Sequence, residues 1–279
     1  MSALLQGRAR KRTLNAVQVA LILVFAAVML VPIAWICLAA FKRLVDVYQL
    51  KLFFEPTLEN FRTVFGPPYH LGDKLWNSTV VAGVTVLIAI PLATMAAYSF
   101  SRFRMRGERV MFVAILATQF VPAVVIVLPF FLLFRDLGLL DTRTGLILVN
   151  LAIVMPFAIW MIKGFIDGIP MDTEEAALVD GSSRLQVIRN VVLPMAAPGI
   201  VTAGIFCFII AWNEFLFALI LTNNKAVTLT VGLQFFKAEE GDLWNLLAAA
   251  GIIIMVPMFL LALVIQKHFV QGMTMGAVR

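Results

Sequence analysis

The feature that most constrains this chain is a set of six long stretches that carry almost no charge. A helix needs roughly 20 apolar residues to cross the hydrocarbon core of a bilayer, and each stretch is near or above that length. The short alternating segments of a membrane β-barrel are not seen in the sequence. We therefore predict an all-α membrane protein with one transmembrane domain, residues 1–279. Its six expected spans are residues 14–41, 77–100, 110–134, 144–163, 198–222 and 243–266.

The composition agrees with a membrane protein and excludes other classes. Hydrophobic residues make up 62% of the 279 positions and charged residues only 14%, whereas soluble chains carry roughly 25% charged residues. The net charge of +6 does not indicate nucleic-acid binding, because the basic residues flank the apolar stretches. Cys37 and Cys207 both lie within apolar stretches, so we expect neither a disulfide nor a metal site.

The basic residues predict the orientation in the membrane. Dense basic clusters occur at the N-terminus, in residues 8–12, and between the second and third spans, in residues 102–109. Cytoplasmic loops are enriched in Lys and Arg, so we expect both clusters and both termini in the cytoplasm. The segments 42–76 and 222–242 are then expected outside, and the segment 164–197 inside.

The segment 164–197 begins with the signals of a short helix. Asp172 followed three residues later by Glu175 resembles a capping box, although the motif itself uses Ser or Thr. The alanines that follow favour a helix, and Gly181 suits the left-handed position that ends one. We therefore expect a short helix between Asp172 and Gly181 on the cytoplasmic face.

A second helix is expected directly after the first. Ser183 with Gln186 forms a capping box, and the apolar pattern continues until Pro194, where we expect the helix to end. Two short helices that meet at Gly181 would make a rigid projection able to fit a groove on a soluble partner. The spacing alone favours a purely structural role, in which Glu175 only caps its helix and Gly181 only makes a turn.

The hairpin contains a pattern that resembles the EAA loop of ABC importer permeases. It reads E-A-A-x3-G-x9-V-x-L-P from Glu175 to Pro194, and departs from the family pattern only at Val191, where the family has Ile. The resemblance continues through the W-N-E-F sequence that starts at Trp212 and through the tail, residues 272–279. The chain is most similar to the second, six-span permease subunit of maltose-type carbohydrate importers, which have the type I ABC importer permease fold.

In that family the EAA loop is a coupling helix, which docks in a cleft of the ATPase subunit and transmits its closure to the pore. The resemblance implies that Glu175 pairs with a basic residue of the ATPase. It also implies that the two alanines after Glu175 allow a close approach and that Gly181 sets the angle between the helices. The residues expected to couple to the ATPase are Glu175, Ala176, Ala177, Asp180, Gly181, Leu193 and Pro194.

The resemblance also implies the partners and the location. They are a homologous permease subunit, two ABC ATPase subunits, an extracytoplasmic sugar-binding protein that contacts the segment 222–242, and a carbohydrate substrate. The location is a bacterial inner membrane. The chain has no G-x-x-x-x-G-K-[ST] loop, so we expect no enzyme activity and no bound cofactor, with ATP and Mg used by the ATPase.

Polar residues inside the spans are few. Glu214 is the one clear ionisable residue there, which gives little support to the alternative of a stand-alone secondary transporter or channel. Trp212, Asn213 and Glu214 are candidates for contact with sugar hydroxyls, and the other interpretation is that they hold helices together by hydrogen bonds. Gln119 and Asn150 are weaker candidates for the substrate path, with the same two interpretations.

Overall fold

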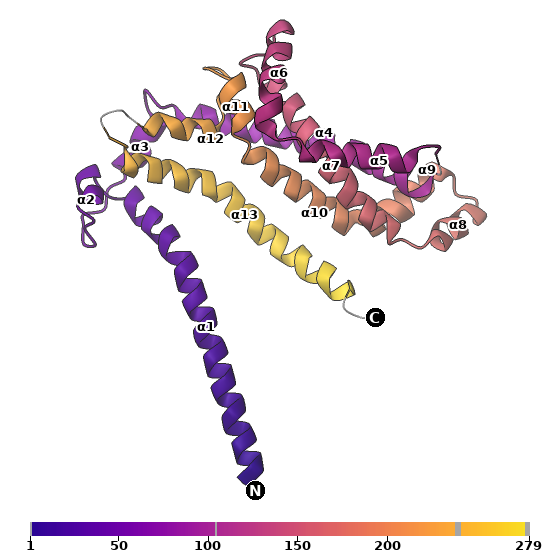
Figure 1. Cartoon of the computed structure of the whole chain (residues 1–279), viewed down its shortest axis with the longest axis horizontal. Helices are drawn as coiled ribbons and strands as arrows, with labels where there is room; N and C mark the ends of the chain where they lie inside the picture. The colour runs from indigo at the N-terminus through magenta and orange to yellow at the C-terminus, as the bar shows by residue number, and fades with distance from the viewer. Residues whose placement is uncertain (1, 104, 238–240, 277–279) are drawn as a thin grey trace. The chain divides into compact units, whose positions relative to one another are not determined.

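The computed structural model describes residues 2–103, 105–237 and 241–276, which form helices joined by short loops (Figure 1). No strand occurs among these residues. The α-helices are α1 (Ser2–Ala40), α2 (Leu44–Tyr48), α3 (Glu59–Phe65), α4 (Leu71–Arg102), α5 (Glu108–Ala117), α6 (Ala123–Asp136), α7 (Arg143–Asp167), α8 (Met171–Val179), α9 (Arg184–Val187), α10 (Leu193–Trp212), α11 (Leu216–Leu221), α12 (Leu229–Gly232) and α13 (Trp244–Gly276). Three further helical turns are η1 (Thr118–Phe120) and η3 (Leu233–Phe236), both 3-10, and η2 (Ile188–Val192), which is a π-helix.

The described residues contain five continuous helices that are long and apolar enough to cross a membrane. They are Val17–Ala40, Leu71–Arg102, Arg143–Asp167, Arg184–Trp212 and Trp244–Leu263. A sixth crossing is formed only if Glu108–Phe120 and Ala123–Asp136 count together, and these two helices are bent by 97° at their junction. The predicted all-α membrane fold is therefore confirmed, with five continuous helices able to span a membrane and one bent pair of helices in place of the expected third span.

The expectation of one continuous helix over residues 110–134 is wrong. α5 passes into the 3-10 turn η1, and Val121 is extended, with φ −77° and ψ 119°. The next residue, Pro122, disfavours helical backbone in the residue before it and has no N–H to donate. For this reason the helix stops at Phe120 and α6 begins at Ala123.

The span expected at residues 198–222 is also divided, and it begins earlier than expected. The helix ends at Trp212 and restarts as α11 at Leu216. Pro194 does not end a helix, contrary to the prediction, because the chain runs from α9 through the π-helix η2 into α10. Pro194 lies just after η2, and a local π-helical turn lets a membrane helix continue past a residue that has no N–H to donate.

The chain forms two compact units, of which the first contains residues 1–69 and 236–253. Within this unit the side chains of residues 17–34 of α1 are almost all exposed. An apolar helix that its own chain leaves uncovered is suited to lipid, because all its backbone hydrogen bonds are internal.

The loop after α1 is built around a buried lysine. The side chain of Lys42 is fully buried, and its Nζ donates to the carbonyl oxygen of Lys51 at 2.6 Å. The same Nζ lies 4.4 Å from the ring centroid of Trp35 and 4.9 Å from that of Phe54. Asn60 donates from Nδ2 to the carbonyl oxygen of Lys42 at 2.8 Å, so both the side chain and the backbone of Lys42 are held by hydrogen bonds.

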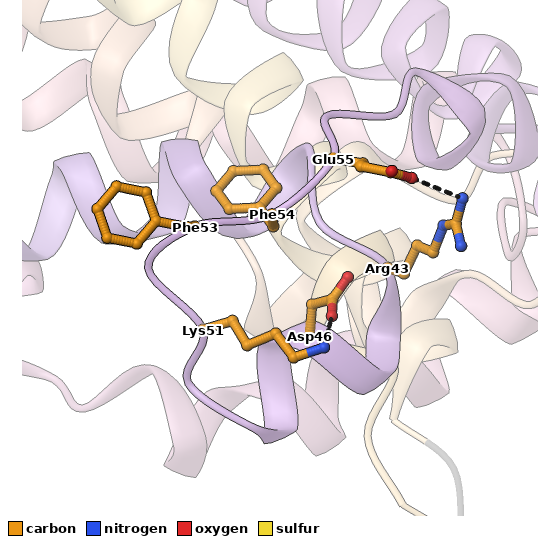
Figure 2. Close-up of a pocket in the computed structure, with 6 residues that line it drawn as sticks. All are labelled: Arg43, Asp46, Lys51, Phe53, Phe54 and Glu55. Carbon is orange, nitrogen blue, oxygen red and sulfur yellow. Dashed lines mark hydrogen bonds and ion pairs between the residues drawn. The ribbon is translucent and has the colours of Figure 1, made fainter.

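A surface hollow of about 400 Å³ lies on the same loop. Figure 2 shows the side chains that line it, among them Lys51 and Phe54. Two ion pairs border it, Arg43–Glu55 at 3.6 Å and Lys51–Asp46 at 2.7 Å. The first pair is exposed at both ends, and exposed pairs add little to stability. The shape of the loop therefore depends mainly on the buried lysine contacts.

The second unit contains residues 70–235 and 254–279, and its core is formed by α4, α7 and α10. Small residues at four-residue spacing on α4 are fully buried, as are their counterparts on α7, and all belong to one apolar cluster: Ala89, Ala93 and Ala97, with Val154, Ala158 and Ile162. Small side chains let membrane helices approach closely. In a bilayer the hydrophobic effect does not drive helices together, so this close packing holds them instead.

Gly199 of α10 gives a test of this packing. It lies so close to the ring of Phe165 that no methyl group fits, whereas a Cβ on Gly204 would lie 3.6 Å from the nearest atom of Ile90. We expect Gly199→Ala to lower the thermal stability of the purified protein, by about 1–3 kcal/mol, because the core would be overpacked. Gly204→Ala is the control and should be neutral or stabilising, since both changes gain the same helix propensity. Equal melting temperatures for the two variants would contradict the close contact.

Candidate functional site

The predicted hairpin is present and is formed by α8 and α9. α8 ends in a Schellman motif, in which Gly181 is left-handed with φ +88°. The N–H of Ser182 donates to the carbonyl of Ala177 at 3.0 Å, and the N–H of Gly181 donates to that of Leu178 at 3.1 Å. The turn expected at Gly181 is thus confirmed, and a side chain at this position would be strained.

One of the two expected helix caps is present. Ser183 Oγ accepts from the N–H of Gln186 at 3.4 Å, and Gln186 Oε1 accepts from the N–H of Ser183 at 2.7 Å, which is the predicted capping box. The cap expected at Asp172 is wrong, because α8 begins one residue earlier, at Met171, without a side-chain cap. The N-cap position is instead taken by Pro170, whose side chain has no hydrogen-bond acceptor.

The two adjacent glutamates of α8 have opposite environments. Glu175 is exposed, whereas Glu174 is only 7% exposed. Successive helix residues point about 100° apart, so one carboxylate faces the body of the protein while the next one is free. Of these two glutamates, the sequence pattern predicts only Glu175 as a coupling residue.

Arg102, the last residue of α4, is the partner of Glu174. Its Nε donates to Glu174 Oε1 at 2.6 Å, and both side chains are less than 10% exposed. Its Nη2 also donates to the carbonyl oxygens of Ile166 and Ile169 at the end of α7, each at 3.0 Å. Tyr98 of α4 adds a hydroxyl hydrogen bond to Glu174 Oε2 at 3.1 Å. One guanidinium therefore joins α4, the end of α7 and α8.

The other residues expected to couple to an ATPase lie on or near the hairpin. Ala176 and Asp180 are exposed and Ala177 is half-buried on α8, while Leu193 and Pro194 form the first turn of α10. A cavity of about 200 Å³ lies between α8 and α9. Its lining includes Tyr98, Arg102, Glu174, Glu175, Leu178 and Arg184.

The residues expected on a substrate path are not gathered in one place. Glu214 lies in the break between α10 and α11, and its carboxylate accepts from the N–H groups of Phe217 at 2.7 Å and Ala218 at 2.9 Å. Asn213 donates to the carbonyl of Ile209 in its own helix at 2.8 Å. Both polar side chains are thus used locally, to cap the two helix ends at the break.

The remaining candidates make different contacts. Trp212 is 2% exposed, and its Nε1 has no hydrogen-bond partner among the described residues. Gln119 donates from η1 to the carbonyl of Ile153 in α7 at 3.0 Å, which is a bond between helices. Asn150 is buried and donates to Leu146 of its own helix at 2.9 Å. Contact of these residues with a substrate stays a prediction.

The loop after α11 is held by the carboxylate of Asp141, which no sequence motif marks as a functional residue. Asp141 accepts hydrogen bonds from four successive backbone N–H groups, residues 223–226, at 3.0 to 3.3 Å. Burial acts to raise the pKa of Asp141, but these four donors outweigh it and hold the pKa below its ordinary value of 3.8. The ionised carboxylate therefore stabilises this loop.

A pH-dependent stability is expected from Asp141. A lowered pKa in the folded state gives stability that is present above the ordinary pKa and is lost as the pH falls through the lowered value. Asp141→Asn should therefore lower the melting temperature at neutral pH, and its difference from the unmodified protein should shrink as the pH falls below the ordinary pKa of 3.8. Asp136→Asn is the control, because Asp136 is exposed and pairs with its neighbour Arg135. A difference that is constant with pH would exclude this role.

Some expected features lie partly outside the described residues. These are residues 277–279 of the tail and residues 238–240 of the segment 222–242. Among the described residues, no three His, Cys, Asp or Glu side chains are grouped so that they could hold a metal ion.

Several apolar helices long enough to cross a membrane, with an exposed hairpin before a late one, define a multi-pass membrane protein. Residues 89–275 match the family described as "Binding-protein-dependent transport system inner membrane component". The chain belongs to this family, and it is a permease subunit of an ABC importer.

Relatives and a solved structure agree over nearly the whole chain. The probable ABC transporter permease protein y4oR of Sinorhizobium fredii is 36% identical and covers 92% of each chain. The trehalose transport system permease protein SugB of Mycobacterium tuberculosis is 36% identical over 97% of this chain and 99% of its own. A chain of the bacterial ABC transporter involved in the import of the acidic polysaccharide alginate has a TM-score of 0.75 and 30% identity, with 92% of this chain and 97% of that chain covered.

Proposed function

We propose that this permease carries a carbohydrate and is driven by an ATPase that docks on α8. The observation that carries the proposal is the hairpin itself. It is rigid, because a Schellman motif and a capping box fix its turn, and it leaves Glu175 and Ala176 of α8 exposed. An exposed carboxylate beside small side chains suits a basic groove on another protein.

The proposed mechanism separates energy use from transport. Two ATPase subunits bind ATP and Mg and hydrolyse the ATP, and this chain binds neither ATP nor Mg. When the ATPases close, a groove on one of them moves α8, with Glu175 paired to a basic residue of that groove. The motion passes through Gly181 and η2 into α10 and so into the half of the pore that this chain contributes; a homologous permease contributes the other half.

The carbohydrate assignment rests on two relatives. SugB is named for trehalose transport, and the structural relative for the import of alginate. In the proposed arrangement both termini and α8 face the cytoplasm of a bacterial cell. The segment 222–242 faces outward, where a sugar-binding protein docks. Trp212, Asn213 and Glu214 are the proposed contacts of the sugar on its path.

Charge reversal in the hairpin is expected to uncouple the importer. In the assembled transporter, Glu175→Lys should abolish the ATP hydrolysis that the loaded binding protein stimulates, because the carboxylate would become a cation in a basic groove. Gly181→Pro should do the same, since proline cannot adopt the left-handed φ of this turn. Glu108→Lys, a charge reversal outside the hairpin, is the control. Normal stimulation in both hairpin variants would refute α8 as the docking helix.

The substrate class can be tested on the cognate binding protein. Its melting temperature would be measured with a panel of mono-, di- and oligosaccharides, amino acids and inorganic anions. We expect a sugar to raise it, because a ligand that binds only the folded state stabilises that state. A rise with amino acids or anions alone would exclude a carbohydrate importer.

A further inference from the structure

α4 is held by polar side chains at both of its ends. It is 32 residues long, which corresponds to roughly 48 Å at 1.5 Å per residue. Its C-terminal end is bonded to α8, as described above, and its N-terminal end is bonded to the segment that follows α11. Both sets of bonds lie within the second compact unit.

The N-terminal end uses Asn77 and Ser78. Asn77 Nδ2 donates to the carbonyl oxygens of Lys225 at 3.0 Å and Val227 at 2.9 Å. Ser78 Oγ accepts from the N–H of Leu229 at 2.8 Å. Asn77 and Ser78 are at most 4% exposed, so water cannot readily replace these bonds.

Two further contacts tighten the same end. Arg143 Nε donates to Asn77 Oδ1 at 2.7 Å, which fixes the amide in the orientation that both carbonyls need. Gly232 of α12 lies against the side-chain stem of Lys74, where an added Cβ would be 2.5 Å from Cδ. The segment 225–232 is therefore attached to α4 by both hydrogen bonds and packing.

The length between the two ends is well packed. Ala89 and Ala93, on either side of Pro91, are both fully buried in the core cluster that α4 shares with α7 and α10. Pro91 removes one backbone hydrogen bond, but the close packing continues across it. A displacement at one end of α4 is thus carried along the helix instead of being absorbed in a loop.

We propose that α4 is the mechanical link between the segment 225–232 and the docking helix α8. Asn77 and Ser78 attach it at one end, and Arg102 and Tyr98 at the other. This inference rests on the proposed function, in which α8 receives the ATPase and the segment after α11 faces the binding protein. Binding-protein docking then shifts the segment 225–232, α4 moves with it, and Arg102 displaces Glu174 and α8. The four residues are positioning residues, because none of them is required to touch sugar or ATP.

The test is a double-mutant cycle in the complete transporter reconstituted in lipid nanodiscs. ATP hydrolysis is measured with the binding protein loaded with the sugar that raises its melting temperature most. Arg102→Gln and Asn77→Ala should each lower the stimulation about tenfold, a typical size for coupling between two sites. In the double variant the stimulation should also fall about tenfold and no further, because once α4 is detached at one end, detaching the other end has no additional effect. Two independent structural defects would instead multiply to about a hundredfold, and that result would overturn the proposal.

Matched controls separate the link from nearby changes. Arg109→Gln removes an exposed arginine seven positions after Arg102, and Thr79→Ala removes an exposed hydroxyl that donates to the carbonyl of Leu75 in its own helix. Both should keep the full stimulation. If Arg102→Gln does not assemble with the ATPase, Tyr98→Phe and Ser78→Ala form a milder cycle in which each change deletes one hydroxyl.

The outcomes distinguish this inference from the proposed function. Loss of stimulation in Glu175→Lys, with normal stimulation in all four variants of α4, would leave the docking helix in place and refute the link. Normal stimulation in Glu175→Lys as well would refute the docking helix itself. If every single variant loses stimulation and the double variant of α4 loses no more than each single one, both the docking helix and the link through α4 are supported.

Discussion

The structure of the hairpin region depends on one buried cation. Arg102 is almost fully covered, and a charge in such a place must be paired and hydrogen-bonded to be tolerated. It achieves this with Glu174 and with the carbonyl groups of Ile166, in the last turn of α7, and Ile169, just after it. Removing either ion would leave the other buried without its counter-charge, so the position of α8 against α4 and α7 is strongly specified.

This arrangement gives two adjacent acidic residues separate tasks. Glu174 neutralises Arg102 and fixes α8 to the body of the permease, while Glu175 keeps its charge at the surface. A coupling element needs both properties, since it has to be recognised by a partner and has to pass on the partner's motion. The second carboxylate would achieve little without the first, because a loosely attached helix could move without moving the spans.

Local chemistry explains which parts of the site could be predicted. The turn at Gly181 and the capping box at Ser183 use bonds between residues at most five positions apart, so a short stretch of sequence is enough to predict them. Arg102 and Glu174 are 72 positions apart, and nothing in either stretch marks them as partners. The breaks at Val121 and after Trp212 were missed for another reason. Hydropathy alone does not register the backbone constraint of Pro122 or the side-chain cap that Glu214 provides.

The sequence by itself determined that the chain crosses a membrane, that a hairpin lies before its late span, and that the hairpin resembles a coupling element. These features depend on the total of apolar residues and on neighbouring turn residues. Only the tertiary structure decided which of the two glutamates faces inward, where the spans break, and that α4 is fastened at both ends. Those features depend on side chains from distant segments that meet only after packing, when a buried polar group has to take whichever partner lies within reach.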